Sequence, residues 1–600
     1  MRILSALPIV LAALTWNPAH AVENEDGHVA QSVLLVKNRK ALFRIVVAET
    51  PGTPYQPEGK RARYPIDGLH LAAADLVSYT RKSTGAEPEV LTNQTRDDGL
   101  IHIHVGMTDY VKKLDLDLPR PQGFVIAFPD KRNIVIAGIP LESYEANTRD
   151  GVVYFLRTHL GIRWLLPGEL GEHVPKLDTL TVPVRNVRKE PSFLLRQASG
   201  YGKVFAGGER WAPVRWSRRM GYLSGAGLRF NHNVGNIIDP EKYGKTHPHF
   251  FPFINGKRVV PDASMKRRKG YIHGWEPCYT AEGIADQAAR NIIEHFDKNP
   301  GAYSYSLGIN DGAHICECAP CRERNKDFPE WCQSQSYYEW ANAVVKKVRQ
   351  KYPDRYFGLL AYSRVSPPPR GIVLDDHIVP VLAWETRYFA DPTVGRRKSE
   401  QHVDAWSKAA PTFGWWDYTF EGSYFIPAFY ARHMTKTLKY LHRNGLRFYQ
   451  DEIHPGKYFK NAPQEYLRWR LQWDIDLDAD GILDEWYELT VGKKAAPYMA
   501  KYFAIWEEYW TRRVIQTDWY RQRIDGEFVA PFLQRRECGY MDALTREDVL
   551  EAERLLAKTV ELAGTERQKQ RARFFHDYFA MAKSRLILPY LAHAEMSRKR

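Results

Sequence analysis

Long apolar runs are scarce in this chain of 600 residues, because only the amino terminus carries one. Residues 3–16 are apolar, but this run is shorter than the ~20 residues that a membrane-spanning helix needs. Arg2 precedes the run, and an Ala-His-Ala cleavage pattern follows it at residues 19–21. The sequence therefore predicts a signal peptide over residues 1–21, no membrane span, and export of the mature chain to the periplasm or the exterior.

Several common functional fingerprints are missing as well. The chain has no G-x-S-x-G elbow, Walker loop, H-E-x-x-H helix or G-x-G-x-x-G turn. Zinc-finger spacing, RNP-like motifs and a dense basic arm are also absent, although the formal net charge is +14. These absences argue against the usual serine hydrolases, NTPases, zinc proteases, dehydrogenases and nucleic-acid-binding proteins. We expect no cofactor, and the positive charge favours anionic partners such as acidic glycans.

The patterns that are present predict three domains after the signal peptide. Residues 22–187 mix strands such as "FRIVVAE" with amphipathic helices, which indicates a small α/β domain. Residues 188–480 alternate short apolar strands with helices, and the strands end in polar residues. The predicted strands are "GLRFNHN", "AYSYSLGIND", "YFGLLAYS", "IVPVLAWET", "TFGWWDY" and "LRFYQDE". This pattern is typical of a (β/α)₈ TIM-like barrel, with a doubly wound sheet as the alternative. Residues 481–600 show helical periodicity and almost no strand signal, which predicts a helical C-terminal domain.

Two predicted barrel strands end in acidic residues that are candidates for catalysis. "GLRFYQDE" ends in Asp451 and Glu452, and "YSYSLGIND" ends in Asn310 and Asp311. Carboxylates at the carboxyl ends of barrel strands face the side where such folds place their active sites. Structural alternatives exist, because Asn-Asp-Gly is good turn chemistry and an acid after a strand can cap a helix.

Further strand ends combine aromatic and polar side chains that suit a sugar. Aromatic faces stack on sugar rings and carboxylates bind hydroxyl groups, although tryptophans of this kind can equally fill a barrel core. The candidates for substrate binding are Trp384, Glu385, Trp415, Trp416 and Asp417. His232 and Asn233, at the end of "RFNHN", are further candidates for holding a sugar hydroxyl.

Cysteine is rare, yet its distribution is uneven. Four of the six cysteines form a C-x-C-x₂-C-x₁₀-C pattern directly after the Asn310-Asp311 strand. In an exported protein disulfides are the favoured interpretation, and a structural zinc or iron site is the second. Either way we predict that these residues pin a long loop at the barrel rim. The predicted structural cysteines are Cys278, Cys316, Cys318, Cys321 and Cys332.

A barrel rich in carboxylates and tryptophan, in an exported protein, points to glycoside hydrolysis. The sequence also resembles known families. "GLHLAAADLVSYTRKSTGAEPEV" and "GVVYFLRTHLGIRWLLPGELGEHVPK" are similar to the N-terminal domain shared by alpha-glucuronidases and beta-hexosaminidases. "FNHNV", "DPEKYGKTHPHFFPFINGKR" and "SLGINDGAHICECAPC" resemble the barrel of a large bacterial family that overlaps glycoside hydrolase family 163.

The resemblance implies a catalytic barrel behind a small α/β domain and, for family 163, endo-β-N-acetylglucosaminidase activity on complex N-glycans. Our hypothesis is a retaining hydrolase of an N-acetylhexosamine-containing glycan or glycoprotein that works by substrate-assisted catalysis. In it Glu452 is the general acid/base, Asp451 orients the acetamide, and Asp311 is in reserve for either role. The alternatives are a non-catalytic glycan-binding protein on a barrel scaffold and an alpha-glucuronidase-like hydrolase of uronic acids.

Overall fold

The computed structural model describes residues 31–48, 68–139, 146–200, 212–222, 228–266, 270–271, 273–312, 314–454, 456 and 458–598. The predicted signal peptide lies outside these residues. Within them, every helix is too short or too polar to serve as a membrane span.

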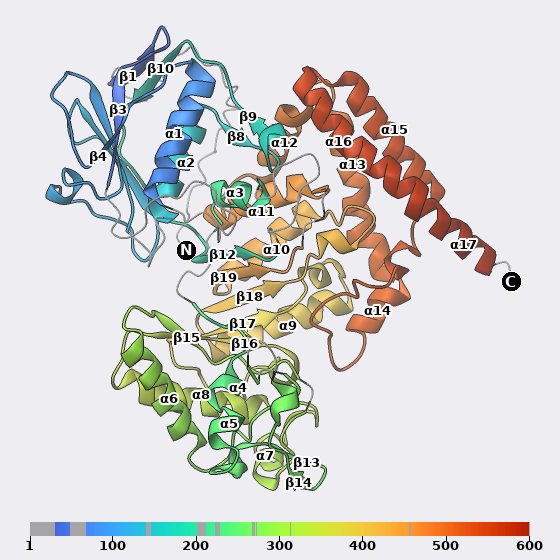
Figure 1. The fold of residues 1–600 in the computed structure, drawn as a ribbon. Helices are drawn as coiled ribbons and strands as arrows, with labels where there is room; N and C mark the ends of the chain where they lie inside the picture. The colour runs from blue at the N-terminus through green and yellow to red at the C-terminus, as the bar shows by residue number, and fades with distance from the viewer. Residues whose placement is uncertain are drawn as a thin grey trace, which may run out of the picture.

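The amino-terminal part is a six-stranded sheet in the order β11-β6-β7-β5-β3-β4, with α1 (Leu69–Thr84) and α2 (Ala146–His159) beside it in Figure 1. The first helix ends where Gly85 adopts φ 77, the left-handed conformation that glycine allows. The strands are β3 (Phe43–Val47), β4 (Val90–Thr92), β5 (Ile101–Val105), β6 (Phe124–Ala127), β7 (Asn133–Ala137) and β11 (Val187–Lys189). A smaller sheet joins β1 (Ser32–Lys37), β2 (Lys40–Ala41) and β10 (Thr179–Pro183), while β8 (Arg163–Trp164) pairs with β9 (Glu172–His173).

The centre of the molecule is a six-stranded sheet in which all neighbouring strands are parallel. Its order is β12-β19-β18-β17-β16-β15, which runs around the sheet without reversing. A doubly wound sheet would reverse at a switch point, so that alternative is wrong. The strands are β12 (Leu195–Ala198), β15 (Ser304–Ser306), β16 (Tyr356–Ala361), β17 (Ile378–Ala383), β18 (Phe413–Asp417) and β19 (Leu446–Asp451).

The sheet is curled, although the described residues form fewer strands than a complete eight-stranded barrel has. Residues 228–232 are not a strand, but His232 forms a parallel bridge with Gly308 just beyond β15. Alternate residues of the strands face the concave side, as the period of two requires. There they meet in one apolar cluster of Leu195, Leu228, Phe230, Leu360, Val379, Val381 and Phe448. This shared cluster joins β12, at one edge of the sheet, to residues 228–230, whose backbone contacts β15 at the other edge.

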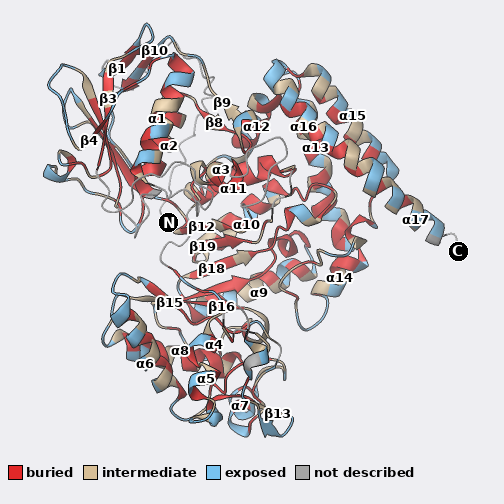
Figure 2. Ribbon diagram, viewed as in Figure 1, coloured by how far each residue is buried: buried red, intermediate tan, exposed pale blue. Residues whose placement is uncertain are grey.

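Helices follow the strands and cover the outside of this sheet, whose strands are largely buried (Figure 2). They are α6 (Ile284–Lys298), α8 (Ser334–Arg349), α9 (Val394–Ala409), α10 (Ala431–Arg443) and α11 (Ala462–Trp473). Shorter elements lie in the connections, namely α3 (Ala212–Arg219), α4 (Val234–Ile237), α5 (Pro240–Tyr243), α7 (Ala319–Arg324), β13 (Phe253–Ile254) and β14 (Lys257–Arg258).

The carboxyl-terminal part is helical in the described residues, as its 3.6-residue periodicity predicts. Thr545 and Thr565 each form a capping box, which fixes where two of the helices begin. Trp486 donates a hydrogen bond from Nε1 to the carbonyl of Leu165 at 2.9 Å, which ties these helices to the amino-terminal part. The helices are α12 (Ala479–Val491), α13 (Ala496–Glu508), α14 (Asp518–Ile524), α15 (Arg546–Leu562), α16 (Glu566–Ala582) and α17 (Leu588–Arg598). The exact domain boundaries stay a prediction.

One histidine on α9 makes the stability of this fold sensitive to acid. The His402 ring stacks on Trp384 with centroids 4.3 Å apart, and its Nε2 is buried without a hydrogen-bond partner in the described structure. Burial lowers the pKa of His402 from 6.5 to about 3. Below pH 6.5 the unfolded chain therefore binds a proton that the folded protein does not, so stability falls as the pH falls.

We expect wild type to lose up to about 2 kcal/mol more unfolding free energy between pH 7 and pH 5 than His402→Phe, which keeps the stacking but cannot titrate. The figure is an upper limit because the side chain is partly exposed. Urea unfolding of both proteins at the two pH values measures it. Equal losses in the two proteins would show that His402 is not the group responsible.

Candidate active site

Backbone strain gathers where the central strands end. Three non-glycine residues adopt a positive φ two or three residues beyond the ends of β16, β18 and β19: Ser363 at 51°, Phe420 at 45° and His454 at 43°. Such conformations are unfavourable for side chains of this size and are found disproportionately at functional sites. The carboxyl edge of the sheet is therefore the first place to look for an active site.

The acids at this edge differ sharply in exposure. The Asp311 side chain is 50% exposed and that of Glu452 is 26% exposed. Asp451, Glu385 and Asp417 are almost completely buried. A catalytic carboxylate must reach its substrate, so Asp311 and Glu452 are the better placed of these five.

A tyrosine connects the two accessible acids. The pKa of Tyr362, directly after β16, is raised to about 12 because the ring is buried and the charges of Asp311 and Glu452 both act on its hydroxyl. The His232 ring lies 6.2 Å from the Tyr362 ring, centroid to centroid. Tyr362 therefore stays protonated at neutral pH.

Each accessible acid also has a histidine beside it. His454 Nε2 lies 3.0 Å from Glu452 Oε1, and His273 Nδ1 lies 3.7 Å from Asp311 Oδ2. Residues 273 and 311 form a parallel bridge, in which the Gly274 amide donates to the Asp311 carbonyl at 3.2 Å. We use the name carboxyl-edge cluster for Asp311, Tyr362, Glu452, His232, His273 and His454.

Aromatic side chains border this cluster on the concave side of the sheet. Trp416 is partly exposed and makes an edge-to-face contact with Phe230 at 5.9 Å between ring centroids. Tyr418, two residues further on, is buried, and the charge of Glu452 contributes to the raised pKa of its phenol, after burial and Tyr362. Among the predicted aromatic candidates, Trp416 is thus the one with an accessible face near the acids.

Asp451 lies on the other side of the strand from Glu452, because successive strand residues point to opposite faces. Its carboxylate accepts hydrogen bonds from the amide of Thr419 at 3.1 Å and from the hydroxyl of Thr419 at 2.6 Å. It also pairs with Arg468, whose side chain is 2% exposed. The structure therefore does not place the predicted Asp451–Glu452 pair in one accessible site.

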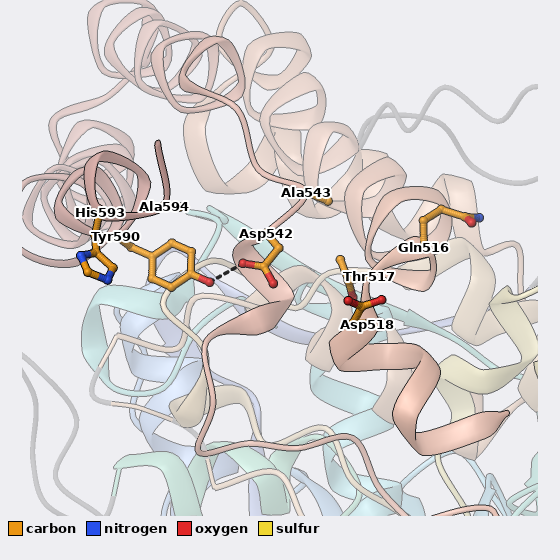
Figure 3. A pocket seen from close by; sticks show the side chains of 8 residues that line it. All are labelled: Gln516, Thr517, Asp518, Asp542, Ala543, Tyr590, His593 and Ala594. Carbon is orange, nitrogen blue, oxygen red and sulfur yellow. Dashed lines mark hydrogen bonds between the residues drawn. The ribbon is translucent and has the colours of Figure 1, made fainter. Parts of the chain in front are cut away.

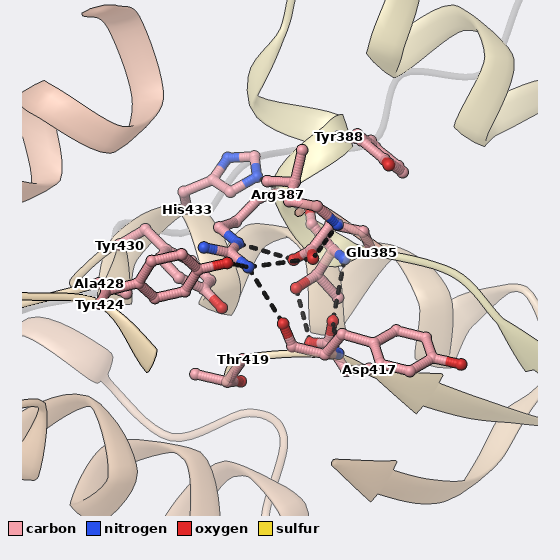
Figure 4. Close-up of polar contacts among 12 residues, drawn as sticks. Glu385, Arg387, Tyr388, Asp417, Thr419, Tyr424, Ala428, Tyr430 and His433 are labelled. Atoms are coloured by element: carbon pink, nitrogen blue, oxygen red, sulfur yellow. Dashed lines mark hydrogen bonds and ion pairs between the residues drawn. The ribbon is translucent and has the colours of Figure 1, made fainter. Parts of the chain in front are cut away.

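Glu385 and Asp417 belong to a buried polar network that Figure 4 shows. Arg387 donates to both oxygens of Glu385, at 2.7 and 3.0 Å. Asp417 accepts from the amide and hydroxyl of Thr386, at 3.0 and 2.6 Å, and from the Tyr449 hydroxyl at 2.7 Å. Burial raises the pKa of Glu385, and the charge of Arg387 opposes this. Both acids use their oxygens within the protein, which indicates a structural role.

The predicted residues around Asn310 hold the backbone in place. Asn310 is buried, accepts from the Gly235 amide at 2.8 Å and donates to the Trp275 carbonyl at 2.8 Å. Asn233 donates to the Ser306 carbonyl at 3.0 Å, and His232 Nδ1 lies 2.6 Å from the Ile309 carbonyl. These contacts fix the chain on either side of Asp311.

The two remaining tryptophan candidates are buried. Trp384 donates to the hydroxyl of Ser399 on α9 at 2.8 Å. Trp415 is fully buried, with its ring 6.2 Å from that of Phe389. Their contacts are those of core residues, which is the alternative that the sequence left open.

The six cysteines are all free, so the disulfides that the sequence favours are not formed. Cys278 Sγ lies 3.6 Å from Cys318 Sγ and 3.8 Å from Cys321 Sγ, whereas disulfide-bonded sulfurs lie about 2.05 Å apart. Cys316 completes a buried group of four thiols. Cys332 is apart from them and donates to the Ser334 hydroxyl at 3.2 Å.

A cavity elsewhere in the molecule is lined by none of the residues of the carboxyl-edge cluster. It has a volume of about 610 Å³ and lies between α17 and the segments around α14 (Figure 3). The Tyr590 hydroxyl donates to Asp542 there, as the dashed line shows. The lining residues are Gln516, Thr517, Asp518, Asp542, Ala543, Tyr590, His593 and Ala594, and none of them is a residue that the sequence singled out.

Sequence reasoning missed Tyr362, His273 and His454. Tyr362 ends the predicted strand "YFGLLAYS", and the rule used for the acids, polar residues at strand ends, would have found it. His454 follows Glu452 in "DEIHP". His273 lies in a connection 38 residues before Asp311, so only the fold brings the two together.

Comparison with known families and proteins gives one family match. Residues 166–504 match the model described as "Domain of unknown function (DUF4838)", which is more than half of the chain. A search of curated proteins finds no match.

Several solved glycoside hydrolases are similar in structure. One is a family GH115 4-O-methyl-alpha-glucuronidase with specificity for decorated arabinogalactans; it shares 12% identity at a TM-score of 0.53, over 91% of this chain and 72% of that one. Another is a family 89 glycoside hydrolase from Clostridium perfringens in complex with 2-acetamido-1,2-dideoxynojirmycin, with 11% identity and a TM-score of 0.41, over 85% and 60%. At these identities and TM-scores, the glucuronidase shows a shared fold, and the family 89 hydrolase adds no further evidence. The overlap with family 163 stays a prediction.

Proposed function

The chain belongs to the DUF4838 family, a domain of unknown function, and we propose that it is a glycoside hydrolase whose active site is the carboxyl-edge cluster. The observation that carries this proposal is that Asp311 and Glu452 are accessible acids beyond the ends of two strands of one parallel sheet, each with a histidine within 4 Å. Glycoside hydrolysis typically uses two carboxyl groups with different roles. The shared fold with the glucuronidase supports the same reaction class.

In the proposed mechanism Glu452 is the general acid/base. It protonates the glycosidic oxygen as the bond to the anomeric carbon breaks, and it later takes a proton from the attacking water. His454, 3.0 Å away, holds the carboxyl group in position. The half-buried position of Glu452 beside Tyr418 and Tyr362 supports this role, because such a site is shielded yet reachable.

The second carboxylate in this proposal is Asp311, which takes the role that the sequence analysis gave to Asp451. In substrate-assisted hydrolysis of an N-acetylhexosaminide, the acetamide oxygen attacks the anomeric carbon, and a carboxylate orients the acetamide. Asp311 has the exposure that this contact needs, while Asp451 is committed to Thr419 and Arg468. The partly exposed face of Trp416 supplies a stacking surface for a sugar ring.

A uronic-acid glycan is the second candidate substrate. The chain carries a net charge of +14, and three histidines lie at the carboxyl edge, which favours an anionic sugar.

The proposal also includes export by the predicted signal peptide. It includes closure of the curled sheet into a barrel, which the apolar cluster shared by β12 and residues 228–230 supports.

A panel of substrates tests the proposal. Purified protein is incubated with aryl N-acetylglucosaminides, aryl uronides and whole glycoproteins, and released sugars are identified by mass spectrometry. We expect release of an N-acetylhexosamine-containing glycan, and release only from uronides would favour the second candidate. Binding on a glycan array without any product would identify a non-catalytic glycan-binding protein instead.

A further inference from the structure

Four cysteine thiols from two segments of the chain converge beside the candidate active site. They belong to Cys278, before α6, and to Cys316, Cys318 and Cys321, at the start of α7. All four residues are buried, none more than 9% exposed, and their sulfurs lie within 4.8 Å of one another. Few arrangements bring four thiols from two segments this close together, and the coordination of a shared metal ion is one of them.

The spacing of the sulfurs fits a tetrahedral metal site. Four sulfurs at about 2.3 Å from a zinc ion at the centre of a tetrahedron lie about 3.8 Å from one another. The distances from Cys278 Sγ to Cys318 Sγ and Cys321 Sγ are 3.6 and 3.8 Å. A disulfide would need one of these pairs to approach to about 2.05 Å.

The surroundings of the sulfurs suit thiolates rather than neutral thiols. The amide of Phe253 donates to Cys316 Sγ at 3.3 Å, and Arg258 Nη1 lies 3.7 Å from the same sulfur. The hydroxyl of Thr280 lies 3.1 Å from Cys321 Sγ. Four thiolates around a divalent ion keep a net charge of −2, and donors of this kind stabilise that charge.

We propose that Cys278, Cys316, Cys318 and Cys321 bind one Zn²⁺ ion in a structural site. All four ligands come from the protein and are buried, and a closed site of this kind has no open position for a substrate or water. Zinc has no redox chemistry of its own, so the ion itself would be stable in an oxidising compartment. The assignment is independent of the proposed hydrolase activity, because it rests on the sulfur geometry and on the donors around the sulfurs.

The site would fasten both segments that carry the Asp311–His273 contact. Cys316 follows Asp311 by five residues, and Cys278 follows His273 by five. Between them, Asn310 donates to the carbonyl of Trp275 at 2.8 Å. Zinc would therefore hold Asp311 in place by fixing the two chain segments directly after the bridge between residues 273 and 311.

Metal analysis of the full-length protein, purified without chelators, tests the site. We expect about one zinc ion per chain, as four thiolate ligands define one tetrahedral site. Replacement with Co²⁺ should give a thiolate-to-cobalt charge-transfer band and the intense visible bands of tetrahedral cobalt. Cys318→Ser should lose the metal, whereas Cys538→Ser, outside the group, should keep it.

Two results would overturn the proposal. One is a disulfide among the four cysteines, found by mass spectrometry of non-reduced peptides. The other is metal-free protein that folds normally and binds no Co²⁺. If Cys318→Ser does not fold, the cobalt spectrum of the wild-type protein still decides the matter. None of these measurements uses catalytic activity, so they remain informative even if the hydrolase proposal fails.

Discussion

Glu452→Gln is expected to lower kcat/KM on a natural glycan by about 10²–10⁴-fold, the range that general acid–base catalysis typically contributes. The amide keeps the shape of the side chain but cannot protonate the leaving oxygen. The loss should be much smaller on an aryl glycoside with an activated leaving group, which departs without a proton. Rates on the two substrate types, measured side by side with wild type, give the comparison.

Asp311→Asn is the matched variant, because it changes the other accessible acid of the same cluster. If Asp311 orients the acetamide, this variant should lose activity on both substrate types, since both need the acetamide to attack. Near-normal rates of Glu452→Gln on a natural glycan would contradict its role as acid/base. If Asp311→Asn were inactive in that case, the chemistry would centre on the strand that ends in Asp311.

The central sheet could be predicted well from sequence because its strands are short, apolar and separated by helices. "YFGLLAYS", "IVPVLAWET", "TFGWWDY" and "LRFYQDE" each contain a strand of the observed sheet. "GLRFNHN" was predicted as a strand on the same grounds, yet its described residues join the sheet only through the bridge at His232. An apolar pattern predicts that a segment lies in the interior. Whether the segment also pairs as a regular strand depends on the neighbouring strands.

Which acids are accessible could not be predicted from the sequence. Asp451 and Glu452 are neighbours in the sequence, but successive strand residues point to opposite faces. Asp451 therefore lies in the protein interior, and Glu452 lies at the carboxyl edge. The partner that decides the outcome is Arg468 on α11, a residue 17 positions away whose role no local pattern reveals. The burial of Glu385 was equally unpredictable, since it depends on Arg387, which donates hydrogen bonds to both carboxylate oxygens.

The cysteines illustrate a different limit of prediction from sequence. Spacing in the chain shows that Cys316, Cys318 and Cys321 are close together, but the fourth member could be Cys332 or Cys278. The fold brings Cys278 to them and leaves Cys332 bonded to Ser334. Disulfides were favoured because of the predicted compartment, whereas the sulfur distances depend on how two distant segments pack.

The buried pair of Asp451 and Arg468 leads to the largest expected effect on stability. Asp451→Ala should lower the free energy of unfolding by up to about 3–5 kcal/mol, because it removes one of the two carboxylates that pair with the buried Arg468 guanidinium and leaves Glu465 as the other. Urea unfolding measures this loss. Glu452→Gln is the neighbouring control and should change stability little, since its side chain is partly exposed and lies outside the core.

A second variant shows whether the charge of Arg468 causes the loss. Asp451→Ala combined with Arg468→Met removes both charges of this pair. Burial raises the pKa of Glu465, the other acid beside Arg468, well above its usual value, so its carboxyl group can stay neutral and much of the lost stability should return. The interpretation fails if Asp451→Ala unfolds at the same urea concentration as wild type but has no activity. Asp451 would then act on the substrate, as its place beside Glu452 in the sequence first suggested, and the carboxylate would have to leave Arg468 and Thr419 to do so.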